Sequence, residues 1–238
     1  MPRKLLILLA LLLIPLLTSG CNTKPKQKKI SNTAFTQSFN ADKKNLVPTG
    51  KNPFFILQPG YTQVLKGKDE GKDAVDEIKV LDETRIVDGV RTRIVKETHR
   101  QDSRIVEISF NFFAIDKTTN SVFYFGEDSQ DIENGKVVGH EGSWLSGRKG
   151  AKFGLIMPGI NLLGAKYMQE IAPGVAEDRA ETVSVSEEIK TPAGTFDNAL
   201  KTKETTPLEP DVVEFKFYAP SIGLIQDGNL KLVKYGFE

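Results

Sequence analysis

The chain has 238 residues, of which 39% are hydrophobic and 26% are charged, a composition that is ordinary for a globular protein and excludes a disordered or fibrous one. It carries 32 Lys and Arg against 31 Asp and Glu, for a formal net charge of +1. A balance so close to zero creates no field for a polyanion, and we expect no nucleic-acid partner.

The N-terminus has the features of an export signal. A short basic start precedes an unbroken apolar run over residues 5–17, which fits a signal peptide and is short for a membrane span. Small residues then precede Cys21, the only cysteine, and residues 17–21 resemble a bacterial lipobox. We predict a signal peptide over residues 1–20 and lipidation of Cys21, which makes the protein a membrane-anchored lipoprotein of the cell envelope, facing the periplasm or the surface. A plain signal peptide and an uncleaved signal anchor are the alternatives.

The next segment, residues 21–49, is poor in large apolar side chains, rich in Lys, Asn, Ser and Thr, and interrupted by prolines. This composition predicts a flexible, lipidated tether. From residue 50 the pattern changes to alternating polar and apolar positions. We therefore expect one β-rich globular domain over residues 50–238.

The alternation is clearest over residues 104–116. Phe110 and Phe112 point to one face of this predicted strand, while Glu107 and Asn111 point to the other. We expect the aromatic face to be the inner one and the polar face to be wet. Shorter alternating runs occur at residues 76–82, 90–97, 181–188 and 230–237.

A second aromatic strand is predicted over residues 211–220, where Phe215 and Phe217 share one face and Glu214 and Lys216 the other. Between the strands lie pairs of residues that tolerate the left-handed conformation of tight hairpin turns. These pairs are Asp88-Gly89, Asn134-Gly135 and Asp227-Gly228.

Helical evidence is weak. Residues 154–172 have apolar spacing that suits a short helix, but Gly and Pro interrupt it at intervals of less than two turns. The fold class we predict is mainly β, a single domain of curved antiparallel sheet resembling a half-barrel, with a Gly-rich loop or short helical segment packed on it.

Residues 121–128, SVFYFGED, form a strand with aromatic side chains on both faces. We expect Gly126 to end this strand, so that Glu127 and Asp128 emerge at the rim of the sheet. Charged residues at a strand end usually promote solubility. Further carboxylates later in the chain complete a candidate acidic cluster, whose members are Glu127, Asp128, Glu170, Glu177 and Asp178.

Several kinds of chemistry were weighed for these residues. Ser143 lies near His140, but the segment lacks the strand-turn-helix context of a nucleophilic serine. Two histidines and no second cysteine give no zinc spacing. The acidic cluster offers the oxygen ligands that Ca²⁺ prefers, without the spacing of an EF-hand loop, and we expect no other cofactor. The simpler alternative pairs the cluster with basic residues close in sequence: Arg148, Lys149, Lys152 and Arg179.

Several blocks in order resemble an uncharacterised family of secreted and lipid-anchored bacterial proteins. The resemblance spans residues 52–228 and departs at Ser221, where the family pattern has Gly. A weaker similarity of the C-terminal half to lipoprotein-carrier-like proteins implies a strongly curved sheet around an apolar cavity, with a loop as plug. The blocks are SVFYFGED, EGSWLSGRKGAKFGLIMPG, YMQEIAPGVAED, TPAGTFDNALKTKETTPLEP and KFYAPSIGLI.

The leading hypothesis is a non-enzymatic, envelope-anchored binding module for an apolar or lipid-like ligand, or for an envelope partner. The Gly-rich segment over residues 139–160 would be the lid, above a cavity of more than about 300 Å³. One alternative is a hydrolase acting on envelope material through paired carboxylates. The other is a calcium-stabilised surface lipoprotein. The predicted ligand-lining side chains are Phe110, Phe112, Trp144, Met157, Phe215 and Phe217.

Overall fold

The computed structural model describes residues 34–238, so the predicted signal peptide, Cys21 and the first part of the tether lie outside the described residues. The described chain contains one 3₁₀ turn, Lys43–Asn45, and is otherwise built of strands and loops. No helix within it is long and apolar enough to cross a membrane. The strands are β1 (Leu46–Val47), β2 (Gly50–Asn52), β3 (Phe55–Leu57), β4 (Tyr61–Asp69), β5 (Lys72–Val87), β6 (Val90–Gln101), β7 (Arg104–Asp116), β8 (Val122–Glu133), β9 (Lys136–Gly139), β10 (Trp144–Leu145), β11 (Lys152–Met157), β12 (Lys166–Met168), β13 (Glu170–Ile171), β14 (Arg179–Thr191), β15 (Gly194–Thr205), β16 (Glu214–Ala219), β17 (Gly223–Asp227) and β18 (Leu230–Phe237).

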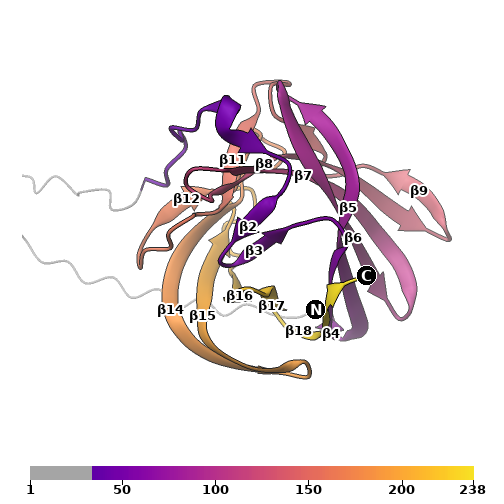
Figure 1. Ribbon diagram of the computed structural model, residues 1–238. Helices are drawn as coiled ribbons and strands as arrows, with labels where there is room; N and C mark the ends of the chain where they lie inside the picture. The colour runs from indigo at the N-terminus through magenta and orange to yellow at the C-terminus, as the bar shows by residue number, and fades with distance from the viewer. Residues whose placement is uncertain (1–33) are drawn as a thin grey trace, which may run out of the picture. The chain divides into compact units, whose positions relative to one another are not determined.

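Thirteen strands form one antiparallel sheet that curls through about 320° and nearly closes into a barrel, seen in Figure 1. Most neighbours in the barrel are also neighbours in the sequence, and β18 pairs with β4 to join the C-terminal strands to the N-terminal ones. The predicted single domain of curved antiparallel sheet is therefore confirmed. The order of the strands is β12-β14-β15-β16-β17-β18-β4-β5-β6-β7-β8-β11-β13.

The two edges of the sheet meet in one short segment. Strand β12 pairs with β14, and β13 pairs with β11, with only Gln169 between them. The chain can pass this closely because Gly154 faces the crossing: a Cβ there would lie 2.1 Å from the Gln169 carbonyl oxygen. The seam of the barrel is thus closed by the chain itself.

Residues 34–49 pack on the barrel. Strand β1 pairs with β7, and the Phe39 ring packs at a tilt against Phe123 with ring centroids 5.9 Å apart. The guanidinium of Arg179 lies 4.8 Å from the ring centroid of Phe35. The folded body therefore includes residues 34–49, which we had assigned to the flexible tether on composition alone. Phe39, Ala41 and Leu46 hold the segment there, because they pack against apolar side chains on the outer face of the sheet.

The hairpin of β2 and β3 lies within the ring of strands in Figure 1. Asn52, which is 1% exposed, holds it in place by donating hydrogen bonds of 2.8 Å to the carbonyl oxygens of Asn120 and Pro158. Its own side-chain oxygen accepts from the Phe54 backbone N–H at 2.8 Å. Because both ends of this amide are used, the hairpin is fixed to the barrel wall.

The alternation predicted over β7 is present, but its two faces are the reverse of those expected. Ser109 and Asn111, on the polar face, point into the barrel. Phe112, which is 2% exposed, belongs to a second apolar cluster on the outer face, and Phe110 packs against that cluster. The outer face is dry because β1, the β5–β6 hairpin and Phe39 cover it.

Strand β16 shows the same reversal. Lys216 and Tyr218 point inward, and Phe215 and Phe217 point outward. The Lys201 ammonium lies over both outer rings, 4.5 and 5.2 Å from their centroids. Alternation identified the two faces correctly, but it does not say which face a closed sheet turns inward.

Strand β8 does not end at Gly126 as we expected, but continues to Glu133. Its pairing with β7 shifts by one residue here, because the chain bulges at Gly126, which has a φ of +131°. A Cβ on this glycine would lie 2.3 Å from the Trp144 carbonyl oxygen. The bulge turns Glu127 into the barrel instead of leaving it at the rim.

The Gly-rich segment over residues 139–160 contributes strands to the barrel wall. Strands β10 and β11 both pair with β8, so the segment is part of the sheet as well as a series of turns. Met157 is fully buried in the inner core. The β2–β3 hairpin, rather than this segment, lies over the interior.

Candidate functional site

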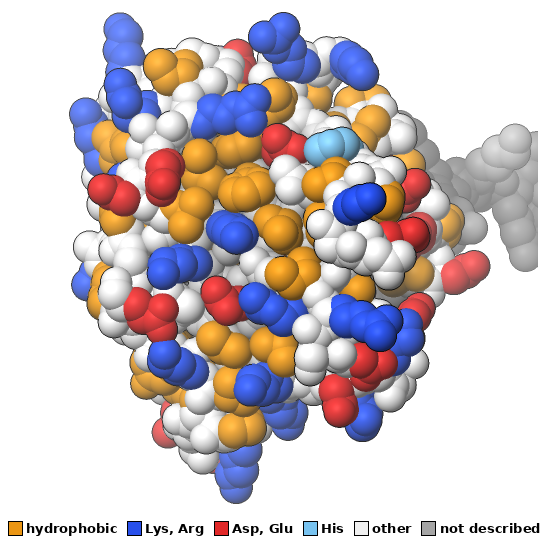
Figure 2. All heavy atoms as spheres, turned by 90° about the vertical axis from the view of Figure 1, so that its right-hand side faces the viewer, with side chains coloured by type: hydrophobic (Ala, Val, Ile, Leu, Met, Phe, Trp, Pro, Cys, Tyr) orange, Lys and Arg blue, Asp and Glu red, His pale blue; other side chains and the backbone are white. Residues whose placement is uncertain are grey.

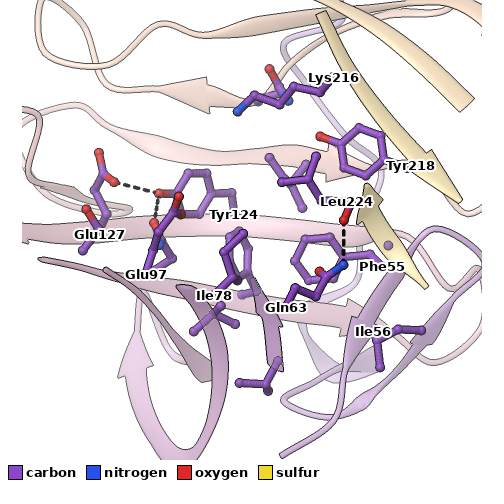
Figure 3. A pocket seen from close by; sticks show the side chains of 18 of the residues that line it. Phe55, Ile56, Gln63, Ile78, Glu97, Tyr124, Glu127, Lys216, Tyr218 and Leu224 are labelled. Atoms are coloured by element: carbon purple, nitrogen blue, oxygen red, sulfur yellow. Dashed lines mark hydrogen bonds between the residues drawn. The ribbon is translucent and has the colours of Figure 1, made fainter. Parts of the chain in front are cut away.

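The barrel encloses a cavity of about 280 Å³, slightly below the volume that we expected of a ligand site. One end is apolar and is formed by the hairpin residues Phe55 and Ile56 together with side chains of the surrounding strands (Figure 3). The apolar lining comprises Phe54, Phe55, Ile56, Ile78, Val80, Val95, Phe113, Ile156 and Leu224.

The opposite end of the cavity is polar and acidic. Figure 3 shows Glu97, Glu127 and the Tyr124 hydroxyl converging there. Tyr124 donates hydrogen bonds to Glu127 Oε2 at 3.0 Å and to the side-chain oxygen of Asn111. Glu170 completes this end and accepts a hydrogen bond of 3.3 Å from the Trp144 indole N–H. Five strands, β6, β7, β8, β10 and β13, bring these groups together.

Burial makes these carboxyl groups weak acids. It raises the pKa of Glu97 to about 8, assisted by the negative charge of Asp76. It raises the pKa of Glu127 to about 7, against the hydrogen bond from Tyr124. The pKa of Glu170 is raised well above its ordinary value, first by burial and then by the charge of Glu127. Each group is costly to ionise unless a positive charge arrives beside it.

One cation lines this cavity. The Lys216 ammonium lies 3.2 Å from Asp227 and 3.5 Å from Glu204, so it is already shared between two carboxylates. Its pKa is raised well above the ordinary value, with the charge of Asp227 as the largest cause. Lys216 therefore leaves the acidic groups at the opposite wall without a direct ion-pair partner.

A buried acceptor without a partner lies at the seam. Gln169 lines the cavity and is 3% exposed; its amide nitrogen donates to Glu204 at 3.0 Å. Its side-chain oxygen is buried and has no hydrogen-bond partner among residues 34–238. Such unsatisfied groups are uncommon in folded proteins.

Two further hollows share lining residues with the cavity. One, of about 320 Å³, includes Glu127, Glu170 and Asp178 and reaches out to Glu209 and Glu214. The other, of about 520 Å³, includes Glu97 and Glu107 and extends past His99 to acidic residues at the end of the barrel. The shared residues make the three hollows neighbours along the inside of the barrel.

His99 sits in the larger hollow between two carboxylates. Its Nδ1 is hydrogen-bonded to Asp76, and its Nε2 lies 3.5 Å from Asp69. The pKa of His99 is raised, chiefly by the hydrogen bond with Asp76. The His99 side chain is 22% exposed, so this histidine is largely removed from solvent.

The six side chains predicted to line a ligand groove do not line this cavity. Trp144 comes nearest, because its ring packs edge-on against Tyr124 and its N–H binds Glu170. Met157 is part of the solid inner core. Phe110, Phe112, Phe215 and Phe217 are on the outer face, for the reason given above.

The predicted acidic cluster is divided. Glu127, Glu170 and Asp178 line the cavity, while Asp128 points outward to His140 at 3.4 Å. Glu177 accepts a hydrogen bond of 2.8 Å from the Gly174 backbone N–H in a turn. Within the described residues, no ion pair joins any of the five to the basic residues expected to neutralise them: Arg148, Lys149, Lys152 and Arg179.

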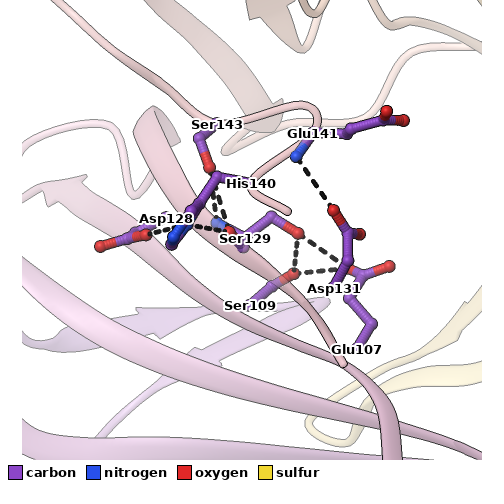
Figure 4. A network of polar contacts seen from close by, with 8 residues as sticks. All are labelled: Glu107, Ser109, Asp128, Ser129, Asp131, His140, Glu141 and Ser143. Carbon is purple, nitrogen blue, oxygen red and sulfur yellow. Dashed lines mark hydrogen bonds and ion pairs between the residues drawn. The ribbon is translucent and has the colours of Figure 1, made fainter. Parts of the chain in front are cut away.

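Ser143 and His140 anchor a loop. Figure 4 shows that both bind the backbone of Ser129: the Ser143 hydroxyl accepts from its N–H at 2.9 Å, and His140 Nδ1 lies 2.8 Å from its carbonyl oxygen. Because each side chain is directed at the backbone, the pair does not form a serine–histidine couple. Beneath them, the hydroxyl groups of Ser109 and Ser129 both donate to Glu107.

Sequence reasoning missed Glu97, Glu107, Glu204 and Lys216 as lining residues, because it treated charged positions in alternating strands as solvent-facing. A signal was present in β6, where Glu97 shares its face with Val95, a residue that is 3% exposed.

For metal chemistry, no group of three His, Cys, Asp or Glu side chains in residues 34–238 is arranged to hold an ion.

Comparisons with family models, curated proteins and solved structures give no match. The class of protein must therefore be argued from the fold and the cavity alone. A nearly closed antiparallel barrel with aromatic clusters and an internal cavity is compatible with a binding module.

Proposed function

We propose that the barrel is a binding module that takes one small amphipathic molecule into its interior. The observation that carries this proposal is the division of the cavity into an apolar end, at Phe55 and Ile56, and an acidic end, at Glu97, Glu127 and Glu170. A binding site that is mostly apolar with a few convergent polar groups fixes a ligand's orientation. The proposed ligand therefore needs a polar group beside its apolar part, which narrows the apolar or lipid-like ligand expected from the sequence.

The module is proposed to work at a membrane. The basic start, the apolar run over residues 5–17 and the lipobox-like residues 17–21 support export and acylation at Cys21. Replacing Cys21 with Ser should release the protein from the membrane fraction and abolish labelling by palmitate, while wild type keeps both. An unmodified thiol at position 21 of the mature wild-type protein would refute the anchor.

Native mass spectrometry of the protein isolated from its own envelope tests the binding proposal. We expect an adduct of small-molecule mass on wild type and its loss in Ile78→Trp, which fills the apolar end of the cavity. Ile105→Trp is the matched control, because Ile105 is on the surface of β7, at 37% exposure. A wild-type protein whose mass shows no adduct, or an adduct retained by Ile78→Trp, contradicts the proposal.

A carboxylate-dependent hydrolase is a second candidate, favoured by one observation. Glu127 and Glu170 lie close enough inside the cavity for the charge of one to raise the pKa of the other. Two carboxyl groups with different pKa values are the usual acid and base of glycoside hydrolysis. In that case the molecule released from Glu170→Gln would be an uncleaved substrate, larger than the one released from wild type. Identical adducts in both proteins would favour simple binding.

A further inference from the structure

The charges of this protein are separated between its interior and its surface. Six carboxyl side chains line the cavity against one ammonium group, that of Lys216. The chain as a whole is nearly balanced, with 32 basic and 31 acidic residues. Many of the basic side chains cover the outside, as the face in Figure 2 shows. The lining carboxylates are Glu97, Glu107, Glu127, Glu170, Asp178 and Glu204.

The two neighbouring hollows extend the same sign of charge. The smaller adds Glu209 and Glu214 to the carboxylates that it shares with the cavity, and its lining holds no Lys, Arg or His. The larger adds Asp69, Glu70 and Asp76, with His99 as the one group that carries a positive charge when protonated. Narrow spaces lined by one sign of charge concentrate the opposite ion. A cation therefore meets a favourable field along the barrel axis, and an anion an unfavourable one.

Aromatic rings accompany the carboxylates. Tyr124 stacks on Phe113 with centroids 4.6 Å apart, and both rings line the cavity next to the acidic end. Aromatic faces attract organic cations, and the attraction is stronger where water is excluded. Six aromatic residues line the cavity in all: Phe54, Phe55, Tyr61, Phe113, Tyr124 and Tyr218.

Two lining side chains have acceptor groups that the protein itself leaves unused. The Glu97 carboxyl group makes no hydrogen bond or ion pair within residues 34–238, and the side-chain oxygen of the buried Gln169 has no partner there. Unlike Glu97, the other acids of the polar end are held, Glu127 by Tyr124 and Glu170 by Trp144. A ligand that donates hydrogen bonds would use these two acceptors, and a positively charged donor also suits the field of the surrounding carboxylates.

From these observations we propose that the ligand is a small organic ammonium ion, with its charged nitrogen among Glu97, Glu127 and Glu170 and its apolar part against the β2–β3 hairpin. This inference rests on the proposed binding function and names the chemical class of the ligand. A divalent metal ion fits less well, because no three His, Cys, Asp or Glu side chains of the described chain lie close enough together to hold one. A neutral ligand would leave the excess of carboxylates unexplained.

Isothermal titration calorimetry with three probes of one shape tests the inference: 2-phenylethylamine, 2-phenylethanol and 3-phenylpropionate, at pH 8.5. We expect the amine to bind wild type at least ten-fold more tightly than the alcohol, and the carboxylate not to bind. Glu97→Gln and Glu170→Gln should each weaken the amine at least ten-fold and leave the alcohol unchanged. Glu133→Gln, at the exposed end of β8, is the matched control and should change neither.

The outcomes separate the two proposals. Equal affinity for amine and alcohol overturns the ammonium assignment while leaving a binding module. Failure of the amine to bind a barrel that carries a natural adduct in native mass spectrometry overturns the assignment in the same way. No probe bound and no natural adduct removes the binding function itself. Heat released by CaCl₂ alone, and lost in Glu97→Gln, would make the site a metal site and also overturn the assignment.

Discussion

The Tyr124 hydroxyl donates a 3.0 Å hydrogen bond to the Glu127 carboxylate, although residues three apart on a regular strand face opposite sides of a sheet. The bulge at Gly126 removes this difference by adding one residue to β8. Both side chains then face the cavity, and one carboxylate of the polar end depends on the backbone conformation of one glycine.

Replacing Gly126 with Ala should therefore destabilise the protein strongly. The new Cβ would meet the Trp144 carbonyl oxygen at 2.3 Å, on a backbone with a φ of +131°. We expect the free energy of unfolding to fall by about 3 kcal/mol in urea denaturation. Gly135→Ala is the control: it also has a positive φ but has no atom within 4 Å, so it should cost only about 1 kcal/mol. Equal losses of unfolding free energy in the two variants would contradict the close approach of Gly126 to the Trp144 carbonyl oxygen.

The stability of the wild-type protein should fall as pH rises from 5 to 8. Burial raises the pKa of Glu97 to about 8, so between its ordinary pKa of 4.5 and that value the unfolded chain loses a proton that the folded chain keeps. Ionisation thus favours unfolding, by up to about 1.4 kcal/mol per pH unit for this group. Asp76, Glu107 and Asp227 act in the same direction on Glu97, and Lys216 acts against them.

Glu97→Gln has no such proton and should show a shallower decline of the urea midpoint over the same pH range. It should be more stable than wild type at pH 8 and similar to it at pH 5. Glu133→Gln, on the exposed end of β8, should follow the wild-type curve. Superimposable curves for wild type and Glu97→Gln would mean that Glu97 is hydrated and ionises freely.

Lys216 should matter more to stability than a surface lysine in a similar ion pair. In Lys216→Met, Glu204 and Asp227 lose a partner within 3.5 Å, and Glu204 is largely buried. We expect a loss of about 2 kcal/mol or more at pH 7. Lys190→Met breaks a 3.7 Å pair with Glu188 on the exposed end of β14 and should cost less than about 0.5 kcal/mol. Similar effects of the two substitutions would contradict the interior position of Lys216.

Ser221→Gly should stabilise the protein slightly. Ser221 has a φ of +62°, a conformation that costs a side-chain-bearing residue energy and that glycine adopts freely. The gain is partly offset by the greater freedom of Gly in the unfolded chain, so we expect about 0.5 kcal/mol. Ser186→Gly, in the exposed part of β14, lacks this benefit and should destabilise. Thermal denaturation of both variants measures the difference. A loss of stability in Ser221→Gly would refute the claim that the backbone of Ser221 is strained.

Much of the fold could be predicted because strands and turns are encoded locally. The alternation over residues 104–116 coincides with β7, and both residues of Asp88-Gly89 have the positive φ of a tight hairpin. Which face of each strand points into the barrel could not be predicted in this way. Phe112 and Asn111 alternate equally well whichever side is inside, and only the covering by β1 and Phe39 makes the aromatic side dry.

The site was harder to predict than the fold, because its groups come from strands far apart in the sequence. Glu127 and Glu170 belonged to the predicted acidic cluster, but Glu97 was given no role and Lys216 was placed on the polar face of its strand, on the general rule that charges are exposed. That rule fails inside a barrel with a cavity, where a charged side chain can be removed from the surface without being packed. For Lys216, no local pattern distinguishes these two environments.

Trp144 allows the most direct test, because it is the only tryptophan of the chain and its N–H is bonded to Glu170 at the acidic end of the cavity. Its fluorescence is to be followed during titration of the folded protein with 2-phenylethylamine at pH 8.5. The structure predicts a saturable change that is lost in Glu170→Gln and absent with 3-phenylpropionate. A signal that stays flat in the folded wild-type protein, or that responds equally to both charges, would contradict a barrel whose interior receives organic cations.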